Sequence, residues 1–194
     1  PDDLRPPAQY CIGIFGRVRA QKGVDVLIAA ALPILVRHTN WAVVVVGEIK
    51  PQEQSFVTAL KQQAEQAGVL DRVVFTGPRP FEELPRLFAC MAIITALSRN
   101  EGFGLTVLEA MSSGKAVVAS RAGAWPDILT SEEDGLLVDI ADAASTQVAL
   151  ERLVTDEDLR ARLAANGRRT VLDRYSVETE AAALLDHYRQ LAEA

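Results

Sequence analysis

Two glutamates flank a glycine-rich turn in the stretch NEGFGLTVLEAM, which covers residues 100–111. Glu101 stands before the turn, and Glu109 stands eight positions later within an apolar pattern of helical spacing. Gly102 and Gly104 inside the turn allow a backbone to approach a ligand closely. The spacing therefore predicts two carboxylates on either side of a turn that opens a helix.

The start of this helix is a candidate anion-binding site. Free N–H groups near Gly104, Leu105 and Thr106 point out of the first helical turn, where the helix dipole also favours negative charge. A second interpretation of the same residues is purely structural, because the sequence from Thr106 to Glu109 matches a helix capping box. Glu101 also has an ordinary interpretation, as an acid placed just before a helix.

A basic loop after the first apolar run offers two cations. Gly16 permits a tight exit from a strand, Arg17 offers a planar two-pronged donor, and Lys22 offers a point charge just before Gly23. Two cations beside a helix start can neutralise a phosphate group, although a solvated surface loop would have the same composition. A nucleotide sugar is a ligand that would use both kinds of group, a phosphate-binding site for its diphosphate and carboxylates for its hydroxyl groups.

Short β-branched runs alternate with longer helical patterns, which predicts how these residues are positioned. This alternation is typical of an α/β fold, here a Rossmann-like, open, mainly parallel six-stranded sheet with helices on both faces. In such a sheet, ligands bind beyond the carboxyl ends of the strands. The expected strands are 10–15, 41–47, 72–77, 91–95, 115–120 and 134–140, and the expected helices are 24–38, 52–67, 81–89, one that begins near residue 105, 143–154, 157–174 and 177–193.

The chain is interpreted as one domain of residues 10–194, preceded by a Pro-rich linker or cut site at residues 1–9. The last helix carries an apolar stripe at helical spacing, with Ser176 as its expected N-cap. We expect this stripe to pack on the same sheet; the alternative is that it docks on a partner domain. The stripe consists of Ala181, Leu184, Leu185, Tyr188 and Leu191.

Composition excludes several classes of function. A net charge of −6 argues against non-specific nucleic-acid binding, which needs a basic surface. Cys11 and Cys90 lie in or beside apolar stretches and are expected to be buried, reduced thiols of a cytoplasmic protein. Two isolated histidines give no signal for a metal site. The absence of a G-x-G-x-x-G motif after the first strand excludes a nicotinamide-dependent dehydrogenase.

The motifs together resemble the C-terminal domain of family 4 (group 1) retaining glycosyltransferases of the GT-B fold. The resemblance is carried by the pairs Gly16-Arg17 and Lys22-Gly23, followed by FTG, SRNEGFGLTVLEAM, AVVAS and DGLLV, and it covers the chain from Tyr10 onward. The segment RNEGFGLT is most similar to the corresponding segment of bacterial lipopolysaccharide-core mannosyl- and glucosyltransferases. Two departures lie in or just after the expected fourth strand, where Ala92 and Leu97 replace the aspartate and the proline that are frequent in the family.

The resemblance implies roles for individual residues. Arg17 and Lys22 would bind the donor diphosphate and stabilise the leaving nucleotide, with backbone amides of Gly104, Leu105 and Thr106 on the phosphate. Glu101 would contact the donor sugar and Glu109 the ribose diol, and backbone near Arg79 would contact the base. Arg17, Lys22 and Glu101 are thus the expected catalytic residues. The expected donor-binding set also includes Gly16, Gly102 and Phe103.

The resemblance further implies metal-independent transfer with retention of configuration, without any cofactor beyond a donor such as GDP-mannose or UDP-glucose. The acceptor would bind an N-terminal domain that is absent from this chain, so the isolated domain is expected to bind donor without transferring sugar. Peripheral association with the inner face of a membrane would involve that absent half. Two alternatives stay open: a sugar epimerase or phosphorylase of the same architecture, and a non-catalytic nucleotide-sugar binding module.

Overall fold

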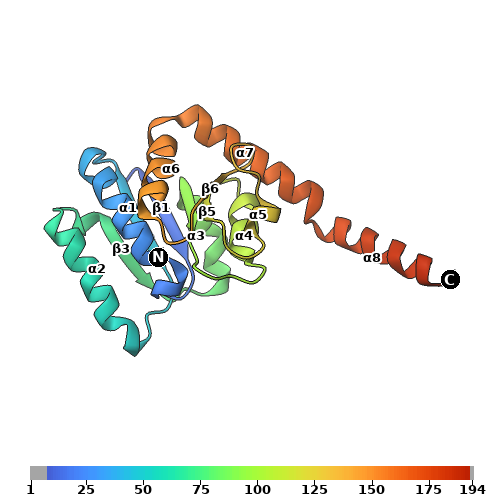
Figure 1. The fold of residues 1–194 in the computed structure, drawn as a ribbon, viewed down its shortest axis with the longest axis horizontal. Coiled ribbons are helices and arrows are strands. Elements are labelled where there is room, and N and C mark those ends of the chain that lie inside the picture. Colours follow the sequence, from blue (N-terminus) through green and yellow to red (C-terminus); the bar gives the residue numbers. More distant parts are fainter. Residues whose placement is uncertain (1–7, 193–194) are drawn as a thin grey trace.

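The computed structural model describes residues 8–192 and shows a six-stranded sheet between two layers of helices (Figure 1). The strands are β1 (Tyr10–Phe15), β2 (Trp41–Val46), β3 (Val73–Gly77), β4 (Ile93–Ala96), β5 (Ala116–Ser120) and β6 (Leu136–Val138). The helices are α1 (Val24–Arg37), α2 (Gln54–Gln66), α3 (Leu84–Cys90), α4 (Leu105–Ser112), α5 (Trp125–Ile128), α6 (Ala143–Thr155), α7 (Glu157–Arg174) and α8 (Val177–Ala192). Short 3-10 turns are η2 (Ala20–Lys22), η3 (Pro51–Glu53), η4 (Leu70–Arg72) and η5 (Phe81–Glu83).

Every strand pairing in this sheet is parallel, and the strand order is β3-β2-β1-β4-β5-β6. This confirms the expected Rossmann-like α/β class and makes the sheet wholly parallel. The direction of winding reverses between β1 and β4. Ligands of doubly wound sheets bind at this switch point, beyond the carboxyl ends of the strands.

Two apolar cores cover the two faces of the sheet. The helices α1, α2 and α6 pack on one face together with side chains such as Ile12 and Val43, and α3, α4 and α5 pack on the other with side chains such as Val44 and Val117. Both faces are therefore buried. This explains why the sequence of β2, WAVVVV, shows no alternation of apolar and polar residues. The buried sheet positions the loops at its carboxyl edge.

Most expected elements are confirmed with small shifts at their ends. The expected strand over 134–140 is wrong in length, because β6 spans only Leu136–Val138 at the edge of the sheet. The short helix α5 was not expected from the sequence, since four residues are too few to show helical periodicity. Residues 1–7 of the expected linker lie outside the described residues.

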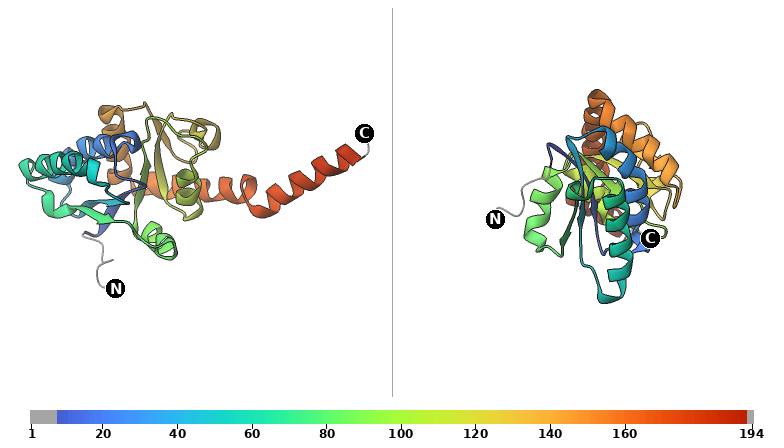
Figure 2. Two further views of the ribbon diagram at one scale, coloured as in Figure 1. Left: turned by 90° about the horizontal axis from the view of Figure 1, so that it is seen from below. Right: turned by 90° about the vertical axis from the view of Figure 1, so that its left-hand side faces the viewer.

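The expectation that the last helix packs on the sheet is wrong. Helix α8 leaves the globular body as an extended arm, and none of its residues is buried (Figures 1 and 2). Its beginning is as expected, because Ser176 Oγ accepts a hydrogen bond from the Thr179 N–H at 3.2 Å. Leu185 and Leu191 are more than half exposed, so the apolar stripe has no partner among the described residues.

Helix capping differs from one of the two interpretations of the glutamate motif. Helix α4 begins after Gly104, which has no side chain that could cap it, so Thr106 and Glu109 do not form a capping box. Helix α7 is capped by Asp156, whose carboxylate accepts from the Leu159 N–H at 2.8 Å. The acidic stretch Asp156-Glu157-Asp158 is thus part of a helix start.

The two cysteines are free thiols, as expected, although only Cys11 is fully buried. Burial raises the pKa of the Cys11 thiol to about 11, which keeps it protonated at neutral pH. Across residues 8–192, no helix combines the length and apolar character needed to span a membrane.

Candidate functional site

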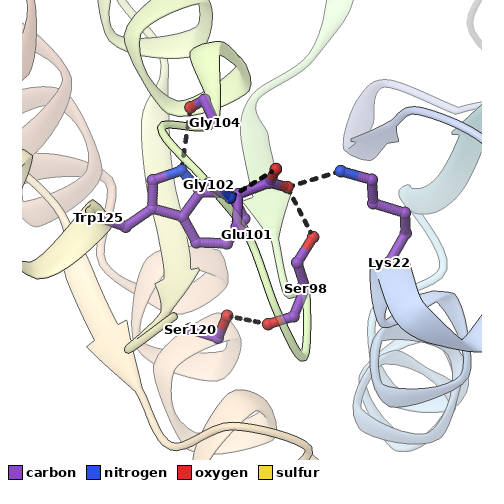
Figure 3. Close-up of polar contacts among 7 residues, drawn as sticks. All are labelled: Lys22, Ser98, Glu101, Gly102, Gly104, Ser120 and Trp125. Carbon is purple, nitrogen blue, oxygen red and sulfur yellow. Dashed lines mark hydrogen bonds and ion pairs between the residues drawn. The ribbon is translucent and has the colours of Figure 1, made fainter. Parts of the chain in front are cut away.

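The loops that follow β1 and β4 meet at the switch point of the sheet. Lys22 closes η2 after β1, and Glu101 follows β4. Their side chains point toward each other, with Lys22 Nζ 2.6 Å from Glu101 Oε2 (Figure 3). A cation and a carboxylate that are far apart in sequence therefore form one charged pair at the ligand-binding edge of the sheet.

Further hydrogen bonds fix the Glu101 carboxylate. Ser98 Oγ donates to Oε2 at 3.1 Å, and the Gly102 N–H donates to Oε1 at 3.3 Å. The buried hydroxyl of Ser120 in turn donates to the carbonyl oxygen of Ser98 at 2.7 Å (Figure 3). Partial burial raises the pKa of Glu101, but Lys22, Ser98 and the Gly102 amide outweigh that effect and lower the pKa below its ordinary value. Glu101 is therefore ionised at neutral pH.

The turn between Glu101 and α4 is shaped by glycine. Gly104 has a φ of 71°, and a Cβ there would overlap the Trp125 ring and the Glu101 side chain. The buried indole of Trp125 donates from Nε1 to the Gly104 carbonyl oxygen at 3.0 Å (Figure 3). Gly104 has no side chain, so the N-cap position supplies no capping oxygen to the first N–H groups of α4.

A cleft of about 310 Å³ opens at the carboxyl ends of β1, β2 and β3. Five residues of the expected site line it: Gly16 and Arg17 after β1, Arg79 after β3, and Thr106 and Glu109 on α4. Its remaining lining is mainly apolar and comes from Phe15, Val46, Gly47, Glu48, Pro78, Leu84 and Phe88.

A smaller cavity adjoins this cleft and shares Phe15 and Thr106 with it. Lys22 and Glu101 line the smaller cavity. The two hollows together bring Arg17, Lys22 and both glutamates of the motif to one edge of the sheet. Gly102, Phe103 and Leu105 line neither hollow; Phe103 and Leu105 are exposed on the rim of the turn.

The two glutamates have opposite electrostatic environments. No hydrogen bond or ion pair from the described residues reaches the Glu109 carboxylate, and burial raises its pKa above the ordinary value. Glu101, in contrast, has three donors. An unsatisfied carboxylate in a cleft favours a ligand that donates hydrogen bonds, such as a diol.

Several residues that build the site were not identified from the sequence. Ser98 and Ser120 hold Glu101, and Trp125 holds the glycine turn. Gly123 has a φ of 56°, and a Cβ there would overlap the carbonyl oxygens of Glu101 and Gly102. The only sequence signal was a glycine and a tryptophan close together in AGAWP, which has many structural interpretations.

No group of three or more His, Cys, Asp or Glu side chains within residues 8–192 is arranged to hold a metal ion. The site brings together two cations, helix-start amides and two carboxylates. This set can bind a diphosphate ester and several hydroxyl groups at once.

Comparison with known proteins identifies the family. The model of glycosyl transferases group 1 matches residues 3–170. The lipopolysaccharide core biosynthesis mannosyltransferase LpcC of Rhizobium leguminosarum bv. viciae is 37% identical over 185 residues, which cover 95% of this chain and 52% of that protein. The LpsB mannosyltransferase of Rhizobium meliloti (strain 1021) is 34% identical over 187 residues, which cover 95% of this chain and 53% of that protein. The chain therefore spans about half the length of the curated relatives it matches.

Solved structures agree with this result. The C-terminal domain of the group 1 glycosyl transferase LpcC from Francisella tularensis has a TM-score of 0.86 and 38% identity, and the match covers 91% of both chains. Anabaena Alr3699/HepE, solved in complex with UDP and glucose, has a TM-score of 0.84 and 25% identity over 97% of this chain and 52% of that one. On these grounds, the chain belongs to the group 1 glycosyl transferases.

Proposed function

We propose that this chain is the donor-binding half of a retaining glycosyltransferase that uses a nucleoside-diphosphate sugar in lipopolysaccharide or related cell-envelope polysaccharide synthesis. The observation that carries the proposal is the convergence of Arg17, Lys22, Glu101 and Glu109 on two adjoining hollows at the switch point. The similarity to two lipopolysaccharide core mannosyltransferases supports the biological setting.

In this proposal the diphosphate lies between Arg17, Lys22 and the first amides of α4. As the bond from the sugar to phosphate stretches, negative charge grows on the diphosphate, and these groups stabilise it without having to reorganise. Glu101 then accepts hydrogen bonds from the sugar, and Glu109 accepts from the ribose diol. Loss of one such donor should raise the activation free energy by about 3 kcal/mol.

The ion pair of Lys22 with Glu101 suits this role. A carboxylate beside a diphosphate would otherwise repel it, but the Lys22 ammonium neutralises Glu101 at 2.6 Å. The same lysine can then contact phosphate with its remaining donors, since an ammonium carries three. Glu101 keeps lone pairs for sugar hydroxyl groups.

The base would lie in the larger cleft, near Arg79, over the apolar side chains at the ends of β1 to β3. Two donors are the leading candidates: GDP-mannose, because two relatives are mannosyltransferases, and UDP-glucose, because a structural neighbour was solved with UDP and glucose. The acceptor would bind the half of the protein that lies outside this chain. Reduced thiols support a cytoplasmic location, and contact with the inner face of a membrane would involve that other half.

A thermal-shift screen with GDP, UDP, ADP and their sugars tests donor binding by this chain. The proposal predicts a rise in melting temperature with at least one of them at millimolar concentration, and no rise for Arg17→Ala. The complete protein then tests transfer. Sugar transfer to a lipopolysaccharide-core acceptor supports a glycosyltransferase, donor rearrangement or hydrolysis without acceptor supports an epimerase, and binding without turnover supports a non-catalytic module.

A further inference from the structure

We infer that Arg99 and Asp25 form a positioning clamp between two segments. The clamp holds the Lys22 loop (residues 16–25, from the end of β1 into the first turn of α1) against the Glu101 loop (residues 97–104, between β4 and α4). The inference rests on the proposed function, because it assigns a role to residues beside the proposed donor site. Neither residue lines the two hollows that would receive the donor. Arg99 and Asp25 are thus positioning residues rather than catalytic ones.

The contacts of Arg99 cross between the two loops. Its guanidinium binds the Asp25 carboxylate with two parallel hydrogen bonds, Nη1 to Oδ1 at 2.9 Å and Nη2 to Oδ2 at 2.7 Å. Its backbone N–H donates to the carbonyl oxygen of Gln21 at 2.9 Å. The guanidinium also donates to the carbonyl oxygen of Ala20. One residue therefore binds the Lys22 loop at three points, at residues 20, 21 and 25.

These three points bracket Lys22 on both sides along the chain. Residues 20 and 21 precede it within η2, and Asp25 follows in the first turn of α1. Arg99 is itself only two residues before Glu101 in the sequence. Fixing Arg99 to these points consequently fixes the backbone of Lys22 relative to that of Glu101.

Such a clamp answers a physical need of the site. A lysine side chain has four flexible carbons, and holding it in one geometry costs conformational entropy. Fixing the backbones of both partners in advance reduces the ordering that remains when a donor binds. The short distance from Lys22 Nζ to Glu101 Oε2 is therefore a product of the Arg99 clamp as well as of the pair's own attraction.

The geometry requires arginine and not simply a positive charge. A guanidinium presents a planar fork that matches both carboxylate oxygens, whereas the lysine ammonium is a point charge. The side chains of Arg99 and Asp25 are each about a third exposed, so solvent screens their attraction. Breaking the fork should therefore disturb loop geometry more than it lowers global stability.

The decisive comparison uses Arg99→Lys, with Asp25→Asn as a second variant that breaks the same fork from the other side. The first readout is the pKa of the Glu101 carboxyl, which carbon NMR measures in the ligand-free chain. The second is the affinity for GDP and for UDP, measured by calorimetry. The matched control is Arg152→Lys, which breaks a two-pronged pair with Glu132 at 2.6 and 2.8 Å that joins α6 to the loop before β6.

We expect Arg99→Lys and Asp25→Asn to raise the Glu101 pKa toward its ordinary value and to weaken nucleotide binding about 2- to 10-fold. Arg152→Lys should change neither quantity, and all three variants should melt within a few degrees of the parent chain. A Glu101 pKa that is unchanged in both clamp variants would overturn the inference. If the parent chain binds neither GDP nor UDP, the proposed function fails, but the pKa comparison still decides whether the clamp exists.

Discussion

At the scale of single residues, the pair of Lys22 and Glu101 is the electrostatic centre of the site. Removing the ammonium leaves Glu101 partly buried, with Ser98 and the Gly102 amide as its remaining donors among residues 8–192. Lys22→Gln should therefore raise the Glu101 pKa, because the burial that disfavours the charge is no longer offset. Carbon NMR of the Glu101 carboxyl measures this shift directly, and an unchanged pKa would contradict the observed pairing.

The same pair gives a signed dependence of stability on pH. The folded-state pKa of Glu101 lies below its unfolded value, so its ionised form stabilises the fold above the unfolded pKa. That contribution is lost as the pH falls through the lowered folded-state pKa. We expect it to be about 1 kcal/mol or less because both side chains are partly solvent-exposed. Melting curves from pH 7 to pH 3 should show a smaller loss on acidification for Lys22→Gln than for the parent chain.

The charge of Glu109 has the opposite effect on the stability of the fold. Its folded-state pKa is raised by burial, so its charge is a cost to the fold at every pH above that raised value. Glu109→Gln should therefore increase the melting temperature of the ligand-free chain at pH 7 by at most a few degrees, and the gain should vanish on acidification below the unfolded pKa. In parallel, nucleotide binding should weaken, because an amide is a poorer partner for a ribose diol. A variant that is less stable and binds equally well would contradict both roles.

At the scale of elements, the loop between β5 and α5 supports the glycine turn before α4. The Ala124 N–H donates to the Gly102 carbonyl oxygen at 3.2 Å, and Gly123 lies against the carbonyl oxygens of Glu101 and Gly102. Gly123→Ala combines a left-handed φ of 56° with steric overlap against that backbone. The expected cost is roughly 2 kcal/mol or more, or a fall in melting temperature of about 4–8 °C.

Gly102→Ala is the matched control for this substitution. The φ of Gly102 lies outside the left-handed region, and a Cβ there would meet no atom within 4 Å. It should melt within about 2 °C of the parent chain, since surface substitutions usually change stability by less than about 0.5 kcal/mol. Equal melting temperatures for the two alanine variants would show that the β5–α5 loop does not brace the turn.

The elements were predictable from the sequence to the extent that their signals are local. Continuous apolar runs such as WAVVVV and the glycines that close them indicate buried parallel strands without any knowledge of their neighbours. Loop-to-loop contacts have no such signal. Arg99 and Asp25 are 74 positions apart, and Lys22 and Glu101 are 79 apart, so no sequence period links them. The capping box at Thr106 was wrong for a related reason: the packing of Trp125 on Gly104 fixes where α4 begins.

At the scale of the whole molecule, α8 continues the chain from α7, but none of its residues is buried against the globular body. An amphipathic pattern predicts that a face will be covered, but it does not say by which part of a protein. The stripe of Ala181, Leu184, Leu185, Tyr188 and Leu191 stays exposed here. The chain spans about half the length of the curated relatives it matches. We expect the other half of the complete protein to cover it.

Truncation after Tyr175 tests this view of α8. Because no residue of α8 is buried, its removal should leave the melting temperature of this chain within about 2 °C of the parent value. In the complete protein, the same truncation should be strongly destabilising. A large loss of stability in the isolated chain would show that α8 packs on the sheet after all.

The charge of the whole chain also bears on its function. A net charge of −6 opposes any anion that approaches, so an anionic donor must be held by local groups. Arg17 lines the larger cleft and Lys22 the smaller one, and both lie beside the uncapped start of α4. Binding of a nucleoside diphosphate should thus depend steeply on the exposed side chain of Arg17, which contributes little to the stability of the fold.

The most direct measurement is a calorimetric titration of GDP and UDP into the parent chain, into Arg17→Ala and into Arg189→Ala. Arg189 is an exposed arginine on α8 and serves as the matched control for loss of one positive charge. The account predicts saturable binding of at least one nucleotide to the parent and to Arg189→Ala, with binding lost or weakened at least about 100-fold in Arg17→Ala, as expected for a charged contact to phosphate worth about 3 kcal/mol. Binding that is equal in all three proteins, or absent from the parent chain at millimolar nucleotide, would contradict it.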